Sequence, residues 1–219
     1  MKYIKEYNEF DIDPFNEDDW DEVEPDNTFL TWLKVKYPDE SKWKDIKDID
    51  CENQKLTDLI GIDKLINLTY LYCHYNQLSE LDISNNINLE HLYCENNQLT
   101  NLNIIKNINL EHLSCSHNNL TKLDVTKNIK LEELYCDNNS LTELDVTKSI
   151  KLKELSCSNQ LTELDVTKNI NLEKLFCDNN QIIELDLTKN IELITLNCDN
   201  NPLNELDVTK NIKLKHFKK

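Results

Sequence analysis

The sequence predicts an α/β solenoid, in which a parallel β-sheet forms the concave face, short segments form the convex side and a small helical cap covers the N-terminal end. The main observation is the spacing of the cysteines, which is 22, 21, 21, 21, 21, 20 and 21 residues. A fixed period of this length is typical of a chain that adds one coil per repeat. The cysteines are Cys51, Cys73, Cys94, Cys115, Cys136, Cys157, Cys177 and Cys198.

Composition excludes several other classes of protein. The 219 residues carry a formal charge of -17, and every one of the 24 basic residues is lysine. Such a charge repels a phosphate backbone, so we expect no nucleic-acid partner. No apolar run reaches the roughly 18 residues that cross a bilayer, and the first residues lead into acids rather than an apolar signal region. We therefore expect no membrane partner, and a cytoplasmic location in the protein's own cell or in a host cell that receives it as an effector or viral product.

The chain begins with an acidic leader over residues 1–27. This segment holds eleven acids and two lysines. Its composition favours a disordered or loosely packed tail that aids solubility. An alternative is an acidic decoy that imitates the charge of a nucleic acid for a basic protein.

A helical N-terminal cap is predicted over residues 28–50. Asn27 or Thr28 is a suitable first capping residue, and Pro38 ends the helix. A second helical turn is expected from Asp39 to Lys44, with Trp43 in it. The apolar face of the cap should cover the first coil, because an open coil edge exposes apolar surface and unpaired strand groups. The apolar residues of the first helix are Phe29, Leu30, Trp32, Leu33 and Tyr37.

Each repeat has two halves, shown by residues 131–141, which read LxxLxCxxNxL, and residues 141–150, which read LxxLDVxxxI. The pattern resembles the leucine-rich repeat, with cysteine at a position usually held by leucine, and is similar to the short 21-residue class of bacteria and viruses. The resemblance covers residues 46–217. The first coil, residues 56–68, is similar to the 22-residue internalin-type unit. We expect residues 51–219 to form about eight coils without a separate C-terminal cap.

Columns of equivalent residues should stack one coil apart, about 4.8 Å. The leucines, the cysteines and the valine or isoleucine of the second half are expected inside as core, with the thiols reduced and without a metal. The asparagines after the strands are expected to support turns, and the shortened coil at residues 157–161 should change that asparagine ladder locally. An isoleucine column is also assigned to the core: Ile87, Ile108, Ile129, Ile150, Ile170, Ile191 and Ile212.

Two further columns have alternative interpretations. The aspartates at positions such as Asp124 and Asp145 favour local hydrogen bonds within turns, with calcium binding as the weaker alternative because the glycine-rich consensus is missing. The threonine column that includes Thr126 leaves open a flat binding face for ice or polysaccharide, but charged columns on both sides argue against it.

Outward positions of the strands are the candidate binding site, because leucine-rich repeats use this face for partners. Aromatic side chains on a rigid surface are favourable anchors. A ladder of His91, His112 and Glu133 also leaves open a metal site or a pH-sensitive patch. The candidate residues are Tyr70, Tyr72, His74, Tyr75, His91, Tyr93, His112, His117, Glu133, Tyr135, Asp137, Phe176 and Asp178.

The resemblance implies a module that binds another protein through this face. The sequence has no phosphate loop, zinc-protease helix or nucleophile beside a base, so we expect no enzyme activity, cofactor or metal. The alternative is a structural or assembly protein that associates through its uncapped C-terminal coil or within a larger particle. We expect the protein to be a monomer or to self-associate weakly end to end.

Overall fold

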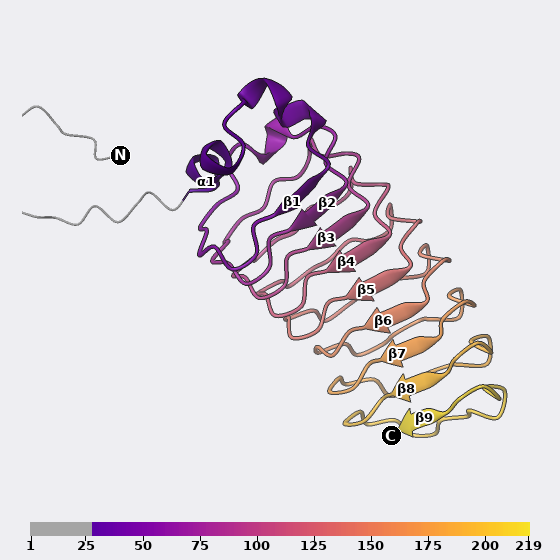
Figure 1. The fold of residues 1–219 in the computed structure, drawn as a ribbon. Helices are drawn as coiled ribbons and strands as arrows, with labels where there is room; N and C mark the ends of the chain where they lie inside the picture. Colours follow the sequence, from indigo (N-terminus) through magenta and orange to yellow (C-terminus); the bar gives the residue numbers. More distant parts are fainter. Residues whose placement is uncertain (1–27) are drawn as a thin grey trace, which may run out of the picture.

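The computed structural model describes residues 28–219 and shows a solenoid built on a parallel sheet (Figure 1). The nine strands of the sheet follow one another in chain order, from β1 to β9. Each is three residues long and pairs in register with the equivalent residues of the next coil. The predicted fold class is confirmed, whereas the acidic leader lies outside the described residues. The strands are β1 Asp48–Asp50, β2 Tyr70–Tyr72, β3 His91–Tyr93, β4 His112–Ser114, β5 Glu133–Tyr135, β6 Glu154–Ser156, β7 Lys174–Phe176, β8 Thr195–Asn197 and β9 His216–Lys218.

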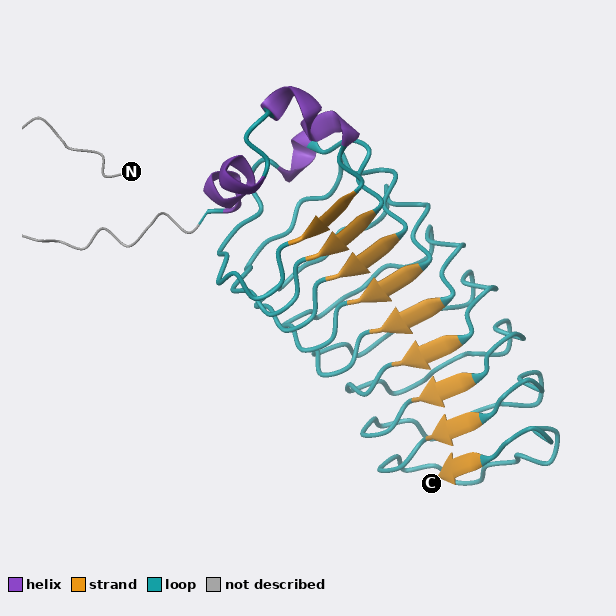
Figure 2. Ribbon diagram, in the orientation of Figure 1, coloured by secondary structure: helices purple, strands orange, loops and turns teal. Residues whose placement is uncertain are grey.

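Helical turns cover the first coil, as predicted (Figure 2). Helix α1 spans Phe29–Lys36 and begins at Thr28, whose side chain accepts a hydrogen bond from the Thr31 backbone N–H. The short 3-10 helix η2 spans Glu40–Asp45 and buries Trp43, whose indole Nε1 donates to the Tyr37 carbonyl at 2.8 Å. A buried indole is favourable only when its N–H is paired.

The first coil contains a second 3-10 helix, η3, which spans Ile62–Lys64 between β1 and β2. Gly61 precedes it with a φ of 102°, and a Cβ at this position would lie 3.1 Å from the Leu30 side chain of α1. Glycine is the residue that adopts this backbone conformation without strain. The glycine therefore lets the cap pack closely on the array.

The cysteine column lies in the core. All eight cysteines are free and buried. Burial in apolar surroundings disfavours the thiolate, so it raises the pKa of these thiols, to about 12 for Cys51. The thiols act as small apolar side chains, and the prediction that the cysteines are buried in the core is confirmed.

A ladder of asparagines supports the turn that leaves each strand. Asn97 is typical, because its side-chain amide donates to the carbonyls of Cys73 and Cys94 while its Oδ1 accepts from the Leu78 N–H at 2.9 Å. The bonds to Cys73 and Leu78 link this coil to the preceding one, whereas the bond to Cys94 stays within the coil. The predicted role of this column in supporting turns is confirmed.

The shortened coil changes this ladder locally, as expected. In full-length coils the residue before the asparagine is left-handed, as in Asn138 with a φ of 52°. The coil at residues 157–161 has no such residue, and Asn159 accepts from the Asn139 N–H instead of a leucine N–H. The sheet nevertheless passes from β5 through β6 to β7 in unbroken register. The missing residue is therefore the left-handed one, which the strand pairing does not need.

The isoleucine column predicted for the core is exposed instead, and this prediction was wrong. Ile129 is 56% exposed and Ile150 is 57% exposed, whereas the preceding Asn128 is 0% exposed. The amide of Asn128 donates to the carbonyls of Ile104 and Asn107 in the preceding coil. Because the asparagine occupies the inward position at this turn, the next side chain points outward. The other members are Ile87, Ile108, Ile170, Ile191 and Ile212.

Candidate partner-binding face

The outward side of the sheet, called the sheet face below, consists of side chains at the first and third positions of each strand. The middle residue of strands β2–β8 is a buried leucine, as in Leu71 of β2, so its two neighbours point away from the core. In-register pairing then brings each outward side chain beside its equivalent in the next coil. The sheet face is therefore a set of parallel ladders.

The N-terminal half of the sheet face, over β2–β4, is a pair of aromatic stacks. The rings of Tyr70 and His91 stack with centroids 4.3 Å apart, and His91 stacks on His112 at the same distance. In the neighbouring ladder, Tyr72 and Tyr93 stack at 4.9 Å with an interplanar angle of 3°. These separations are close to the strand spacing, so the sheet itself holds the rings in place.

The next part of the sheet face, over β5–β7 and called the C-terminal half below, carries a network of hydrogen bonds and ion pairs. His112 Nδ1 lies 3.1 Å from Glu133 Oε2, so the imidazole stack ends on a carboxylate. The Tyr135 hydroxyl donates to Glu154 at 2.7 Å, and Lys174 pairs with the same carboxylate at 2.5 Å. The polar groups of this half are thus largely paired with one another.

These contacts shift the pKa values of three groups. Partial burial lowers the pKa of His91, and the neighbouring His112 lowers it further by charge repulsion. Burial raises the pKa of the Tyr135 hydroxyl, as do its bond to Glu154 and the charge of Glu133. Burial alone would raise the pKa of Glu154, but the bonds from Lys174 and Tyr135 outweigh it and the pKa is lowered. In the C-terminal half of the sheet face, the tyrosine is therefore neutral and the glutamate is ionised.

Acidic side chains beyond the strands are also paired internally. Asp137 accepts hydrogen bonds from the Ser156 hydroxyl at 2.7 Å and the Ser158 N–H at 2.9 Å. Asp178 accepts from the Asn197 amide at 2.9 Å. Both carboxylates therefore already have partners within the chain.

His74 and Glu95 occupy consecutive coils at the position after the cysteine. His74 Nε2 lies 3.2 Å from Glu52 Oε2. His74 Nδ1 and Glu95 Oε2 are both inaccessible to solvent and have no hydrogen-bond partner. A buried polar atom without a hydrogen bond lowers the stability of the folded state. The hydrogen-bonding capacity of this part of the face is therefore not fully used within the chain.

Tyr75 and His117 lie apart from the stacked rings. Both have left-handed backbones, with φ of 54°, and both sit in the turn that leaves a strand. Tyr75 is 54% exposed, and His117 Nε2 lies 3.3 Å from the Asn138 amide. Phe176 is half-buried on β7, away from the N-terminal stacks. The structure thus brings together Tyr70, Tyr72, His74, His91, Tyr93 and His112, with Tyr75 against His74 at the edge of the cluster and His117 apart from it.

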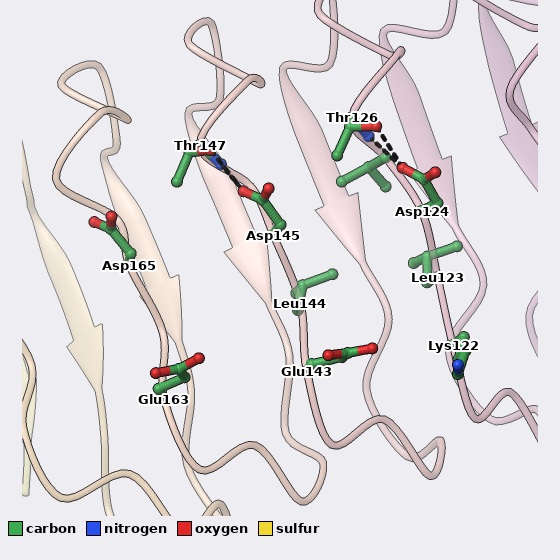
Figure 3. A pocket seen from close by; sticks show the side chains of 11 residues that line it. Lys122, Leu123, Asp124, Thr126, Glu143, Leu144, Asp145, Thr147, Glu163 and Asp165 are labelled. Atoms are coloured by element: carbon green, nitrogen blue, oxygen red, sulfur yellow. Dashed lines mark hydrogen bonds between the residues drawn. The ribbon is translucent and has the colours of Figure 1, made fainter.

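The convex side carries an acidic groove of about 730 Å³ (Figure 3). Its lining includes Asp145, Glu143 and Glu163, with Leu144 between carboxylates. Asp145 accepts from the Thr147 N–H and hydroxyl at 2.9 and 2.6 Å, which confirms the predicted local bonds. Within residues 28–219, no group of three or more histidine, cysteine or acidic side chains is placed to hold a metal ion.

Lys174 is a sheet-face residue that is absent from the predicted set. The coil before it is one residue short, so the cysteine spacing changes from 21 to 20 and counting forward by 21 residues from Glu154 misses this position. Aligning the repeats from the cysteine backwards would have placed Lys174 beside Glu154, because their strands pair at these residues. The cysteine spacing was therefore sufficient to predict the position of Lys174 on the sheet face.

Comparisons with known proteins support the repeat assignment. A family model described as leucine-rich repeats in two copies matches residues 108–149. Internalin J of Listeria monocytogenes serotype 4b (strain F2365) is 37% identical over 69 residues, which is 28% of this chain and 8% of that protein. No helix among the described residues is long and apolar enough to cross a membrane.

Two solved structures show the same architecture. One is the functional domain of InlJ from Listeria monocytogenes, described as including a cysteine ladder; it is 41% identical with a TM-score of 0.66, over 80% of this chain and 44% of that one. The other is the Leptospira interrogans leucine-rich repeat protein LIC12759, 29% identical with a TM-score of 0.70, over 73% and 44% of the two chains. This chain thus spans less than half of either structure.

Proposed function

Because the chain is a leucine-rich repeat protein with internalin-type repeats, we propose that it is a non-enzymatic module that binds another protein through its sheet face. Leucine-rich repeat proteins generally mediate protein–protein interactions. The observation that carries the choice of face is the pair of aromatic stacks over β2–β4. Rings held by the sheet lose little conformational freedom on binding, which favours affinity.

The polar atoms of the stacked rings support the same proposal. Ring edges and the imidazole nitrogens of His91 and His112 can donate or accept hydrogen bonds toward a partner. The internally paired carboxylates of the C-terminal half would add little affinity of their own but would disfavour acidic partners. The preferred partner therefore presents an apolar or aromatic patch to β2–β4.

Affinity capture from lysates of the source cell, and separately of any host cell, tests the proposal. The bait is the full chain beside Tyr72→Ser/Tyr93→Ser/Tyr135→Ser/Phe176→Ser. A matched control carries four exposed convex substitutions, Lys122→Ser/Glu143→Ser/Glu163→Ser/Glu184→Ser. Circular dichroism must show all three folded. Retention of a protein by wild type and control but not by the sheet-face variant supports the proposal, whereas equal retention by all three contradicts it.

A second candidate is an assembly role through the last described coil. Strand β9 is exposed along its whole length, and Phe217 is 49% exposed. Such an edge offers unpaired backbone groups to another chain. Light scattering across a range of concentrations tests this alternative, because a mass that stays monomeric throughout would exclude it.

We also propose a reducing, cytoplasmic compartment, in the protein's own cell or in a host cell. The supporting observation is that all eight cysteines are free and buried. Cell fractionation tests the location, and recovery from the extracellular fraction alone would contradict it.

A further inference from the structure

The ladder formed by the third residue of each strand is interrupted at Ser114 of β4. The same position carries Tyr93 on β3 and Tyr135 on β5, and strand pairing sets the three residues in one row (Figure 1). A serine side chain is much shorter than a tyrosine, and Ser114 is only 8% exposed because the two rings stand higher on either side. The row therefore lacks a ring at a position that the strand register provides for one.

The two flanking rings are held from the sides that face away from Ser114. Tyr93 stacks on Tyr72 of β2, whereas the Tyr135 hydroxyl donates to Glu154 of β6 at 2.7 Å. Within residues 28–219, Tyr93 and Tyr135 form no ring contact with each other. No ring of the described chain therefore covers the side of Tyr93 that faces β4.

The strand spacing fits one additional ring at this position. Strands β3 and β5 are separated by β4, so they lie two strand spacings apart, about 9.6 Å. A ring midway between them would lie about 4.8 Å from each neighbouring ring. Tyr72 and Tyr93 show that rings on adjacent strands of this sheet stack at such a separation, with centroids 4.9 Å apart and an interplanar angle of 3°. A ring supplied by another molecule would thus extend an existing stack by one member.

A carboxylate without a partner lies beside the same position. Glu95 is two residues beyond Tyr93 and belongs to the column that follows the cysteines. In this column Glu52 pairs with His74, and Asp137 accepts hydrogen bonds from serines. The Glu95 side chain forms no ion pair or hydrogen bond with any residue from 28 to 219. Because Glu95 is only partly buried, a cation can approach it from outside the chain.

We propose that the sheet face takes one aromatic side chain of its partner at the Ser114 position, with a lysine or arginine of the partner beside it. The aromatic ring lies between Tyr93 and Tyr135 and stacks on Tyr93, while the cation pairs with Glu95. Charge complementarity favours this occupant, because strands β3–β5 carry no lysine and the chain has a formal charge of -17. This inference rests on the proposed function and specifies the chemistry of the partner.

The second interruption of the ladder, at Ser156 of β6, does not offer the same site. Ser156 also lies between two ring positions, those of Tyr135 and Phe176. Its hydroxyl, however, donates to Asp137 at 2.7 Å, and Tyr135 binds Glu154 on this same strand. Contacts within the chain thus already use this position.

Nuclear magnetic resonance titration of the full chain with synthetic peptides tests the proposal. The probe is acetyl-Lys-Gly-Trp-Gly-Lys-amide. One control peptide has leucine in place of tryptophan, and the other has glutamate in place of both lysines. On binding of the probe, its indole protons should shift upfield, as they do between stacked rings. Each control peptide should bind at least about fivefold more weakly.

Three variants locate the bound ring. Ser114→Tyr fills the position with a ring of the chain itself, so its affinity for the probe should fall at least about tenfold. The matched control is Ser140→Tyr, at an exposed serine outside the sheet face, which should bind the probe as wild type does. Glu95→Gln leaves the rings in place and should reduce the preference for the lysine peptide over the glutamate peptide. Circular dichroism shows whether each variant is folded, and Glu95→Gln keeps the test valid if Ser114→Tyr does not fold.

Three results would overturn the proposal: no binding of the probe up to about 10 mM, equal affinity for the tryptophan and leucine peptides, or full binding by folded Ser114→Tyr. Affinity capture separates this failure from failure of the proposed function. A captured partner that Ser114→Tyr retains, but that the fourfold sheet-face variant loses, would contradict this inference alone.

Discussion

The two halves of the sheet face have the same backbone arrangement, but their outward side chains interact in different ways. Over β2–β4 the outward residues are rings stacked on rings, as in Tyr72 on Tyr93. Over β5–β7 they form a bonded network, in which Glu154 binds both Tyr135 and Lys174. Because the strand register is the same throughout, the difference arises from side chains alone. A repeat scaffold can thus provide a binding surface in some coils and a stabilising network in others.

The largest expected effect is on binding by the N-terminal half. In Tyr72→Ser/Tyr93→Ser, affinity for a captured partner should fall by about 100-fold or more, because buried tyrosine anchors contribute about 2 kcal/mol or more each. Surface plasmon resonance measures the affinity. The unfolding midpoint in urea is the control, and a loss of binding explained by unfolding would remove the distinction between the halves.

The second effect is on stability and concerns the C-terminal half. Glu154→Ala leaves the Tyr135 hydroxyl and Lys174 without their shared partner. We expect a loss of about 1–2 kcal/mol in the free energy of unfolding, measured by urea denaturation, with less than about a tenfold change in affinity. The matched control is Glu163→Ala on the convex side. An equal loss of stability in both variants would mean that the network contributes nothing.

The third effect is a pH dependence of stability in the N-terminal half. The pKa of folded His91 lies below its ordinary value of 6.5, mainly because of burial and then because of His112. As the pH falls through about 6.5, the unfolded chain takes up this proton first, so the folded state loses stability. Urea titrations from about pH 7.5 to 5.5 should show a smaller decrease for His91→Gln than for wild type. Identical pH profiles would show that His91 does not contribute to the decrease.

The smallest effect is the direct coupling between Glu154 and Lys174. The two side chains are 20% and 44% exposed, so solvent screens their attraction. A double-mutant cycle with Glu154→Gln and Lys174→Met should give a coupling of less than about 1 kcal/mol. A larger value would indicate that this ion pair, rather than the tyrosine bond, holds the network together.

Regular features of the fold were predictable because each follows from a repeated local interaction. The cysteine spacing predicted the strand register, and Thr28 and Pro38 indicated where α1 starts and stops. The isoleucine column was misplaced because hydrophobicity alone was used to choose the inward residue. At that turn the amide of Asn128 finds two carbonyls inside, and this pairing decides which side chain is buried.

The candidate site was predictable as a set of positions but not as a set of contacts. The alternation of the strands placed His91 and His112 on the outward face. Their stacking, and the bond from His112 to Glu133, depend on side-chain rotamers that no sequence period specifies. The left-handed backbone of Tyr75, which follows the strand, is likewise not specified by the period of the repeat.

Histidine footprinting of the complex tests the central claim most directly, because the chain carries histidines at both ends of the sheet face. Diethyl pyrocarbonate modifies accessible imidazoles, and mass spectrometry measures each site with and without a captured partner. Binding to the N-terminal half predicts protection of His91 and His112, with no change at His216, which lies exposed on β9. Protection of His216 with unchanged modification of His91 and His112 would contradict the account and favour contact through the last coil.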